Sequence, residues 1–487
     1  MGIITMGTSA NPKEIQNLKR PRRAAVFILK VLLFAVLFVL FFSIFAFENP
    51  ALVERSRTAA ITMTTFVILG ISMTAVYGGF AVGKKKSKEI IPGLCIAAFI
   101  TDFVTYFQLA IMNTNRWNEY QFSFANFGLL FLVFLLQIFA IVGFVYLGNY
   151  LYFKVNPPEN CVVICSDVSK SGEIVRRIGR YKKQYRITEV VAYQDENLKK
   201  LIRHCDSVFL YDVPAEAKSE IIEYAYKHFV NIYLQTGLSD IVVNYAKYMV
   251  LDDLSMLCSN TKELSIEQRF IKRTLDILIS GILLIVLSPI MLIEALAIKL
   301  GDGGPVFYKQ ERLTIYGRKF NVLKFRTMIV DAEKKSGAIL STKNDSRITP
   351  VGKFLRATRM DELPQFLNVL KGDMSLVGPR PERESIAEEY YKEVPEFEYR
   401  LRAKAGLTGL AQISGKYNTT PKDKLMLDLM YIERYNVWMD FVLILQTLKV
   451  FFKRDSTEGI DEGGDGTALR SAEVELVKHE ENHTDVK

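Results

Sequence analysis

The chain has 487 residues, of which 49% are hydrophobic and 12% aromatic, and its formal net charge at pH 7 is +9. This length exceeds that of one ordinary domain and predicts about three folding units. The positive charge does not indicate nucleic-acid binding, because the Lys and Arg residues form no single stripe with interleaved aromatic side chains. They flank apolar segments instead, as expected of a protein that lies against anionic lipid headgroups.

Long apolar stretches crowd the N-terminal part of the chain, at about residues 24–47, 59–83, 90–112 and 126–153. Each is long enough to cross a hydrocarbon core, which requires about 20 residues. The first stretch begins too late and runs too long for a cleaved signal peptide. We therefore predict a four-helix transmembrane unit over residues 1–156.

Basic residues predict the orientation of these spans. The segment before the first span and the loop between the second and third are rich in Lys and Arg, namely Lys19, Arg20, Arg22, Arg23, Lys84, Lys85, Lys86 and Lys88. The other two loops are poorer in basic residues. Because basic loops stay in the cytoplasm, both ends of the unit and everything after it should face the cytoplasm.

Short apolar strands alternate with amphipathic helices between residues 157 and 264. Strands are expected at 161–165, 187–193, 207–211 and 231–234, and helices at 172–185, 196–204 and 215–228. This alternation indicates a parallel, Rossmann-like α/β domain. The loop after its first strand, 166–172, holds one glycine, whereas the dinucleotide fingerprint needs three. We expect a cytoplasmic domain without a nucleotide site, which serves regulation or assembly.

A further apolar segment at 271–300 contains Ser288 and Pro289 near its middle. Proline removes a backbone donor and kinks a helix, and the Ser288 hydroxyl could bond a carbonyl that is freed in this way. Because basic residues flank both ends, we predict a re-entrant helix–break–helix that enters one leaflet and returns. The alternative, a fifth span, would place a charged domain outside, against the distribution of positive charge.

The segment 265–455, expected to be a mostly α domain, contains no His and no Cys, so its chemistry must use carboxylates, hydroxyls, Lys or a metal. Asp361 and Glu362 stand just before a helix predicted at 364–370, with Pro364 in its first turn. A helix N-terminus favours phosphate and keeps carboxylates ionised. Adjacent carboxylates also suit Mg²⁺, which takes one or two of them together with substrate phosphates. The alternative is two solvated acids at a helix start.

Three arginines are candidates for phosphate contact. Arg356 and Arg359 are three residues apart on a predicted helix, so they should share a face that leads to Asp361. Arg380 lies between two prolines that restrict its backbone, and a rigidly held guanidinium suits bidentate phosphate binding. The alternative partners of these arginines are lipid headgroups or surface acids.

Three more residues are weaker candidates for substrate binding. Lys324 and Arg326 either contact a diphosphate or form a basic strand near the membrane. Thr408 lies in a predicted turn between two glycines, which either holds a sugar or nucleotide or only shapes the fold. For Asp440 we expect a structural role, as a cap or in a salt bridge, and Trp438 is expected at the membrane interface.

The motifs in this half of the chain resemble, in order and spacing, those of bacterial sugar transferases, the monotopic polyprenyl-phosphate phosphoglycosyl transferases. The resemblance covers about residues 268–455 and includes Ser288-Pro289. The four-span and Rossmann-like front looks like that of long members, which initiate exopolysaccharide, capsule or O-antigen biosynthesis. The motifs are Lys324-Phe325-Arg326-Thr327-Met328, Asp361-Glu362-Leu363-Pro364-Gln365, Ser375-Leu376-Val377-Gly378-Pro379-Arg380-Pro381 and Ala405-Gly406-Leu407-Thr408-Gly409.

This resemblance implies a polyprenyl glycosylphosphotransferase of the bacterial cytoplasmic (inner) membrane. Such an enzyme transfers a sugar 1-phosphate from a UDP-sugar to undecaprenyl phosphate and releases UMP. The resemblance assigns Asp361 as the nucleophile that forms a phosphosugar-aspartyl intermediate, with Glu362 beside it, and it assigns the helix around Ser288 and Pro289 as the membrane anchor. Glucose and galactose 1-phosphate are the commonest cargoes of long members.

Other classes fit less well. A conventional metal-dependent glycosyltransferase would carry an Asp-x-Asp pair, and none occurs in the sequence. A non-enzymatic membrane scaffold or regulator of polysaccharide assembly gives no reason for arginines around paired carboxylates. The acidic, Gly-rich tail at 456–487 is expected to be disordered. Whether the protein forms a homodimer through its Rossmann-like domain is left open by the sequence.

Overall fold

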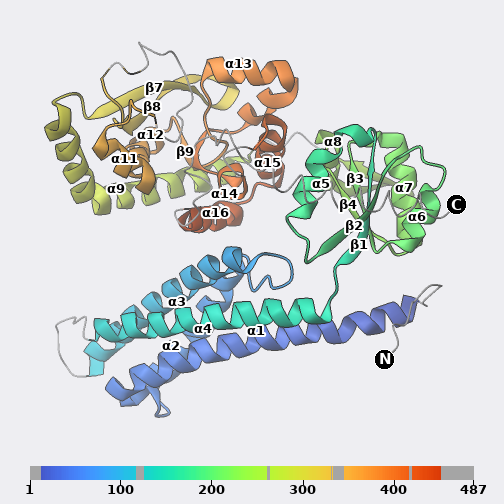
Figure 1. The fold of residues 1–487 in the computed structure, drawn as a ribbon. Coiled ribbons are helices and arrows are strands. Elements are labelled where there is room, and N and C mark those ends of the chain that lie inside the picture. The colour runs from blue at the N-terminus through green and yellow to red at the C-terminus, as the bar shows by residue number, and fades with distance from the viewer. Residues whose placement is uncertain are drawn as a thin grey trace. The chain divides into compact units, whose positions relative to one another are not determined.

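The computed structural model describes residues 12–116, 126–259, 264–330, 332, 345–415 and 419–450, and it describes no side chains for 12–25 and 113–116 (Figure 1). The chain divides between Gln235 and Thr236 into two compact units, here called the first unit and the second unit. The acidic tail lies outside the described residues.

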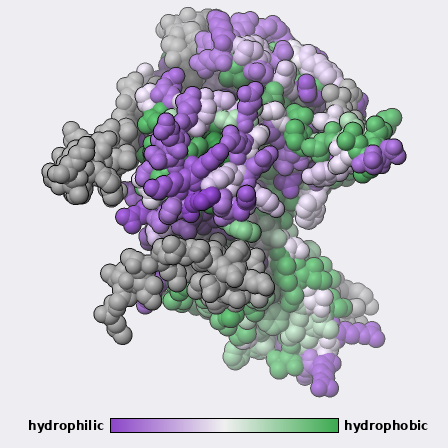
Figure 2. Space-filling view, turned by 90° about the vertical axis from the view of Figure 1, so that its right-hand side faces the viewer, coloured by the Kyte–Doolittle hydropathy of each residue, from purple (hydrophilic) through white to green (hydrophobic). Residues whose placement is uncertain are grey.

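Long helices form the membrane part of the first unit, at α1 (Pro12–Glu48), α2 (Arg57–Val76), α3 (Ser87–Arg116) and α4 (Phe127–Val155). These helices and α9 of the second unit are the five described helices that are long and apolar enough to cross a membrane. In Figure 2 the membrane helices expose mainly hydrophobic side chains, whereas much of the α/β domain surface is hydrophilic. Such an outer surface suits lipid rather than water.

A four-stranded parallel sheet in the order β2-β1-β3-β4 forms the core of the α/β domain. Its strands are β1 (Glu159–Cys165), β2 (Tyr185–Ala192), β3 (Ser207–Tyr211) and β4 (Asn231–Leu234), and its helices are α5 (Gly172–Gly179), α6 (Leu198–His204) and α7 (Ala215–Lys227). The predicted parallel α/β arrangement is confirmed. One helix is shorter than expected, because α5 ends at Gly179, well before the predicted residue 185.

The segment after β4 does not continue this sheet. Helix α8 (Leu238–Asn244) places Ile241 in the apolar core of the second unit, where it packs near α15 (Pro421–Arg434). The strands β5 (Lys247–Leu251) and β6 (Leu254–Cys258) then pair as an antiparallel hairpin whose residues are nearly all exposed. The division between the compact units therefore lies before the boundary at residue 264 that the sequence suggested.

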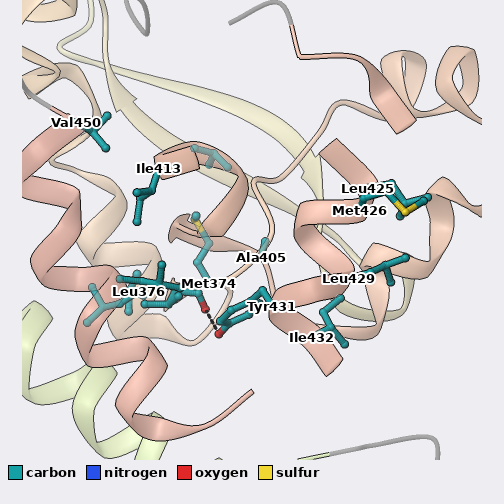
Figure 3. Close-up of a cluster of buried hydrophobic side chains, with 14 of the residues drawn as sticks. Met374, Leu376, Ala405, Ile413, Leu425, Met426, Leu429, Tyr431, Ile432 and Val450 are labelled. Atoms are coloured by element: carbon teal, nitrogen blue, oxygen red, sulfur yellow. Dashed lines mark hydrogen bonds between the residues drawn. The ribbon is translucent and has the colours of Figure 1, made fainter. Parts of the chain in front are cut away.

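The second unit is mostly helical and carries two small sheets. The antiparallel pair is β7 (Phe307–Leu313) with β8 (Lys319–Phe325), and the parallel pair is β9 (Ser375–Val377) with β10 (Gly406–Thr408). Its other helices are α11 (Pro350–Thr358), α12 (Gln365–Lys371), α13 (Glu384–Glu393), α14 (Leu410–Ser414), α15 and α16 (Val437–Val450). Buried side chains from α14, α15 and the β9 and β10 segments meet in one apolar core (Figure 3).

Helix α9 (Ile266–Asp302) is continuous through Pro289, so the predicted break is not an interruption of the helix. The Ser288 hydroxyl donates to the carbonyl of Ile285 at 2.8 Å. That carbonyl lies four residues before Pro289 and would otherwise lack its helical donor, so the expected bond to a freed carbonyl is confirmed. Helical geometry thus survives the proline, and Figure 1 shows the helix bending along its length.

Candidate active site

The Asp361-Glu362 pair lies in a short 3₁₀ turn, Met360–Glu362, between α11 and α12. Arg359 ends α11 in the left-handed conformation (φ 56°), which is uncommon for a residue with a side chain. This reversal carries the chain from α11 into the turn. Pro364 then occupies the N-cap position of α12. The pair therefore directly precedes a helix, as predicted from the proline.

An amide side chain that the sequence analysis did not single out joins α12 to β8. Asn368 donates from Nδ2 to the carbonyl of Asn321 at 2.8 Å, and its Oδ1 accepts from the backbone N–H of Leu323 at 2.9 Å. These two bonds continue the edge of β8 as a neighbouring strand would. They fix β8 beside the turn, so that the next residue, Lys324, reaches the carboxylate pair.

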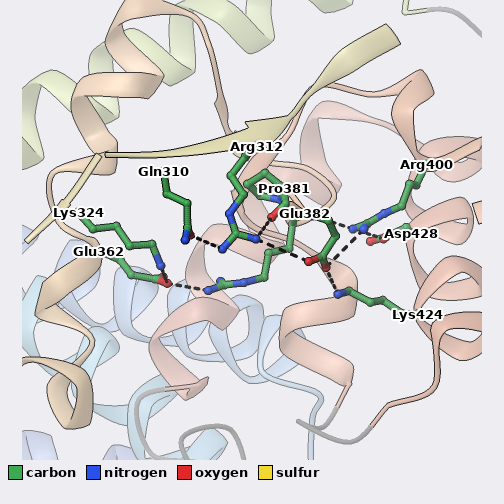
Figure 4. A network of polar contacts seen from close by, with 10 residues as sticks. Gln310, Arg312, Lys324, Glu362, Pro381, Glu382, Arg400, Lys424 and Asp428 are labelled. Carbon is green, nitrogen blue, oxygen red and sulfur yellow. Dashed lines mark hydrogen bonds and ion pairs between the residues drawn. The ribbon is translucent and has the colours of Figure 1, made fainter. Parts of the chain in front are cut away.

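Glu362 is held by two basic side chains (Figure 4). Its Oε1 accepts from Lys324 Nζ at 3.0 Å and from Arg380 Nη2 at 2.7 Å. Burial alone would raise the pKa of Glu362, but the charges of Arg380 and Lys324 outweigh it and hold this pKa well below its usual range. Glu362 is therefore ionised at neutral pH, and its charge is neutralised inside the protein.

Asp361 differs from its neighbour. Within the described part of the chain, its carboxylate has no hydrogen-bond or ion-pair partner, although Lys324, Arg356 and Arg380 act on it electrostatically. Burial, and then the charge of Glu362, raises the pKa of Asp361 to about 6. The expected stabilisation by a helix N-terminus does not outweigh burial here. With this pKa, Asp361 is still mostly ionised at pH 7.

The structure brings Arg356 and Arg359 to the pair, but not on one helical face, because Arg359 lies beyond the last residue of α11. Arg356 Nε donates to Thr327 Oγ1 at 2.9 Å. Burial lowers the pKa of Arg359, an effect that the charges of Glu362 and Asp361 oppose. Both guanidinium groups add positive potential at the carboxylates, and direct contact with a phosphate stays a prediction.

Arg326 and Thr408 make contacts within the protein. Arg326 is 8% exposed and pairs with Asp302, the last residue of α9, which joins β8 to the membrane helix. Thr408 is also buried, and the Thr447 hydroxyl of α16 donates to its hydroxyl at 2.8 Å. Both side chains therefore stabilise the second unit, and a role in substrate binding stays a prediction for each.

Glycine is required where the loop that carries Arg380 crosses the segment before β10. A Cβ on Gly378 would lie 2.2 Å from the carbonyl oxygen of Lys404, and one on Gly406 would lie 2.1 Å from the backbone nitrogen of Gly378. Backbone atoms cannot move aside as a flexible side chain can. This close approach places Arg380 next to Glu362, and Arg400 Nη2 donates to the Arg380 carbonyl at 2.8 Å.

A second charged cluster, which the sequence analysis missed, holds the far end of the same loop (Figure 4). Glu382 pairs with Arg312 at 3.8 Å, with Arg400 at 3.6 Å and with Lys424. Arg400 also pairs with Asp428 at 2.8 Å. The residues of this cluster come from distant parts of the sequence, so no local motif could have indicated the cluster. The cluster fixes the loop on the C-terminal side of Arg380.

The first turns of α9 are tied to β9 and α16. Lys272 Nζ donates to Asp440 Oδ2 at 2.6 Å and to the Val377 carbonyl at 2.9 Å. Asp276 Oδ1 accepts from the backbone N–H of Leu376 at 2.9 Å. The expected salt bridge of Asp440 is therefore confirmed. These contacts link the membrane helix to the strand that precedes the Arg380 loop.

No group of three or more His, Cys, Asp or Glu side chains in the described ranges forms a ready metal site. Of the two predicted Mg²⁺ ligands, Glu362 already accepts from two cations, whereas Asp361 has no hydrogen-bond or ion-pair partner among the described residues. A cation would therefore need Asp361 together with substrate phosphates or another carboxylate, which agrees with the way proteins bind Mg²⁺.

Comparison with known proteins identifies similar sequences for this unit. The UDP-glucose:undecaprenyl-phosphate glucose-1-phosphate transferase of Klebsiella pneumoniae is 44% identical over 182 residues, 36% of this chain and 39% of that protein. The UDP-N-acetylgalactosamine-undecaprenyl-phosphate N-acetylgalactosaminephosphotransferase of Aeromonas hydrophila is 41% identical over 183 residues, 37% of this chain and 43% of that protein. Against four such relatives, the match spans 39–46% of their length.

A UDP-glucose:undecaprenyl-phosphate glucose-1-phosphate transferase of Caulobacter vibrioides is covered more fully. It is 40% identical over 190 residues, which are 38% of this chain and 71% of that protein. The family model described as bacterial sugar transferase matches residues 267–454, which include the carboxylate pair and the Arg380 loop. The chain therefore belongs to the bacterial sugar transferase family.

Proposed function

We propose that the protein transfers a sugar 1-phosphate from a UDP-sugar to undecaprenyl phosphate. The products are an undecaprenyl-diphosphate-linked sugar and UMP. The observation that carries this proposal is the unequal carboxylate pair: Asp361 is unpartnered among the described residues, while Lys324 and Arg380 neutralise Glu362 beside it. The names of the relatives, which describe transfer of sugar phosphates to undecaprenyl phosphate, support the choice of substrates.

In the first half-reaction, an Asp361 oxygen attacks the β-phosphorus of the UDP-sugar. A new P–O bond forms to the aspartate, and the bond from this phosphorus to the bridging oxygen breaks, so UMP leaves with the electron pair. The transition state carries negative charge on its phosphoryl oxygens, and positioned cations stabilise it. Lys324, Arg356 and Arg380 lie close enough to Asp361 to supply that charge.

In the second half-reaction, an oxygen of undecaprenyl phosphate attacks the phosphorus of the phosphosugar-aspartyl intermediate. The P–O bond to Asp361 breaks, and the carboxylate is regenerated. Asp361 therefore serves as nucleophile and then as leaving group, and a carboxyl with a pKa of about 6 suits both roles near neutral pH. The lipid phosphate comes from the bilayer, so the site must open close to the membrane surface.

Mg²⁺ fits this site with Asp361 as a ligand, and when bound it would neutralise the diphosphate of the donor. Glu362, the other predicted ligand, would have to give up at least part of its contact with Lys324 and Arg380 to bind the ion. Excess EDTA should abolish UMP release, and undiminished release in excess EDTA would remove the cation from this proposal.

Helix α9 supports a re-entrant membrane anchor. It has 37 residues and would measure about 55 Å if straight, longer than a hydrocarbon core is thick. Yet Lys272 near its start and Asp302 at its end both pair with residues of the second unit. Its middle is exposed and apolar, with Ile285 76% exposed. A helix that bends, enters the cytoplasmic leaflet and returns satisfies all three observations.

The proposed location is the bacterial inner membrane, with the α/β domain and the second unit in the cytoplasm. The reaction would be the first membrane step of exopolysaccharide, capsule or O-antigen synthesis. The cargo is proposed to be glucose or galactose 1-phosphate. The relatives carry different sugars in their names, including glucose, galactose and N-acetylgalactosamine.

The test is release of UMP from a panel of UDP-sugars by the full chain with undecaprenyl phosphate and Mg²⁺, with Asp361→Asn as the comparison. Release from one sugar that the variant loses would establish the reaction and the cargo. Release that survives Asp361→Asn would show that Asp361 is not the nucleophile. If the folded protein released no UMP from any of the UDP-sugars, the scaffold alternative would be favoured.

A further inference from the structure

Helix α9 buries a carboxylate that the mechanism above does not use. Glu294 is only 5% exposed, and both of its carboxylate oxygens lack a hydrogen-bond partner in the described part of the chain. A buried, unpaired carboxylate is costly, so such groups usually pair or coordinate a metal ion. Acidic residues within membrane helices are, moreover, rare, and they usually mark functional sites.

The position of Glu294 on α9 directs it toward the carboxylate pair. Met291 and Ile298, three residues before and four residues after Glu294, lie on its face of α9. Both pack in one apolar cluster with Met360 and Leu363, the two residues that flank the pair in sequence. The face of α9 that carries Glu294 therefore lies against the turn that carries Asp361.

Electrostatics agrees with this placement, because the charges of Glu294 and Asp361 act on each other. Neither carboxylate has a hydrogen-bond partner within the described ranges. Glu362, by contrast, is saturated by Lys324 and Arg380. The site thus contains one neutralised carboxylate and two that repel each other. Two such carboxylates with substrate phosphates make the ligand set that Mg²⁺ prefers.

We propose that Glu294 and Asp361 bind the active-site divalent cation between them, while Glu362 stays with Lys324 and Arg380. This assignment rests on the proposed phosphotransfer and changes one of the two predicted metal ligands. The cation site would then be formed by one residue of helix α9 and one residue of the turn between α11 and α12. Pro289 lies only five residues before Glu294 on α9, so the path of the helix through the membrane sets the position of this ligand.

Mn²⁺ is the probe for the test, because its paramagnetism reports binding without turnover. The full chain in detergent micelles is titrated with Mn²⁺ alone and followed by electron paramagnetic resonance, for the wild type, Glu294→Gln and Glu267→Gln. Glu267 lies on the same helix, is exposed and bonds Ser265, so its variant is the matched control. We expect Glu294→Gln to weaken Mn²⁺ binding at least tenfold and Glu267→Gln to leave it unchanged.

A metal-preference switch provides an independent test should Glu294→Gln fold poorly. Glu294→Cys should lose Mn²⁺ binding and gain a Cd²⁺ site, because thiolates prefer soft metals. Glu267→Cys controls for the native cysteines and should gain no such site. Unchanged Mn²⁺ affinity in folded Glu294→Gln, absence of Mn²⁺ binding by the wild type, or no added Cd²⁺ site in Glu294→Cys would each overturn the assignment.

The outcomes also separate this assignment from the proposed function. Wild-type protein that releases UMP, together with unchanged Mn²⁺ affinity in Glu294→Gln, would refute the role of Glu294 and leave the phosphotransfer standing. Wild-type protein that binds Mn²⁺ through Glu294 but releases UMP from no UDP-sugar would refute the phosphotransfer as proposed.

Discussion

Replacing Asp361 with Asn should abolish UMP release and at the same time make the second unit more stable at neutral pH. The reason is that the carboxylate is destabilised where it lies, by burial first and by the charge of Glu362 second. Asn has nearly the same shape but carries no charge, so the variant should remove the repulsion and keep the packing.

The magnitude follows from the shift in pKa, from 3.8 to about 6. Each pK unit corresponds to about 1.4 kcal/mol, so ionised Asp361 costs the folded protein up to about 3 kcal/mol. Because this pKa is raised on folding, the folded state binds the proton more tightly. The cost is absent below about pH 4, grows as the pH rises through 6 and is complete above about pH 7.

Thermal unfolding of the full chain in detergent, followed by calorimetry at several pH values, measures this effect. For a unit of this size, 3 kcal/mol corresponds to an increase in Tm of roughly 6–12 °C. The increase should be present at pH 8 and vanish near pH 4. A variant that is less stable than the wild type at pH 8, or whose Tm difference does not depend on pH, would refute the reasoning.

Glu362→Gln is the matched control, because its shift has the opposite sign. The pKa of Glu362 is held low by Arg380 and Lys324 against the effect of burial, so its charge stabilises the folded state. This variant should lower the Tm at pH 7, and the difference should shrink as the pH falls below about 4.5. A higher Tm for Glu362→Gln at pH 7 would contradict the assigned ion pairs.

Three further predictions follow from the site. In the absence of the lipid acceptor, the amount of UMP released in the first turnover should rise as the pH rises through about 6, because Asp361 ionises there. The measurement is the burst of UMP between pH 5 and 8 with saturating UDP-sugar. A burst that does not change with pH would contradict the role of Asp361 as nucleophile. Gly378→Ala should lower the free energy of unfolding by about 3 kcal/mol or more, because its Cβ would meet backbone atoms. Gly172→Ala is the control, because a Cβ at Gly172 would meet nothing within 4 Å. Equal Tm values for the two variants would contradict the crowding at Gly378. Lys272→Met should destabilise the fold by about 3–5 kcal/mol, because the buried Asp440 would lose its cationic partner and keep the hydrogen bond from Tyr431. Adding Asp440→Leu should restore part of the loss, and strictly additive effects would count against the pair.

Local sequence patterns determined the elements that depend on nearby residues. The strands β3 and β4 begin and end where the short apolar runs predicted them. The turn with Asp361 lies before a helix that starts after Pro364, because proline favours helix starts through its own backbone geometry. Ser288 bonds a carbonyl only three residues away. Each of these features is decided within about one turn of helix or one strand.

Tertiary structure decided which candidate side chains make up the site. Arg326 and Thr408, both candidates for substrate binding, pair with Asp302 and Thr447, which are distant in the sequence. The partners of Glu362 come from β8 and from the loop after β9, and Glu294 comes from the membrane helix. Charges and buried polar groups acquire their partners only when distant segments pack, because their pKa values and bonds depend on burial and distance in space. Sequence alone therefore located the proposed nucleophile, and only the folded chain distinguished the carboxylate that is neutralised from the two that have no partner among the described residues.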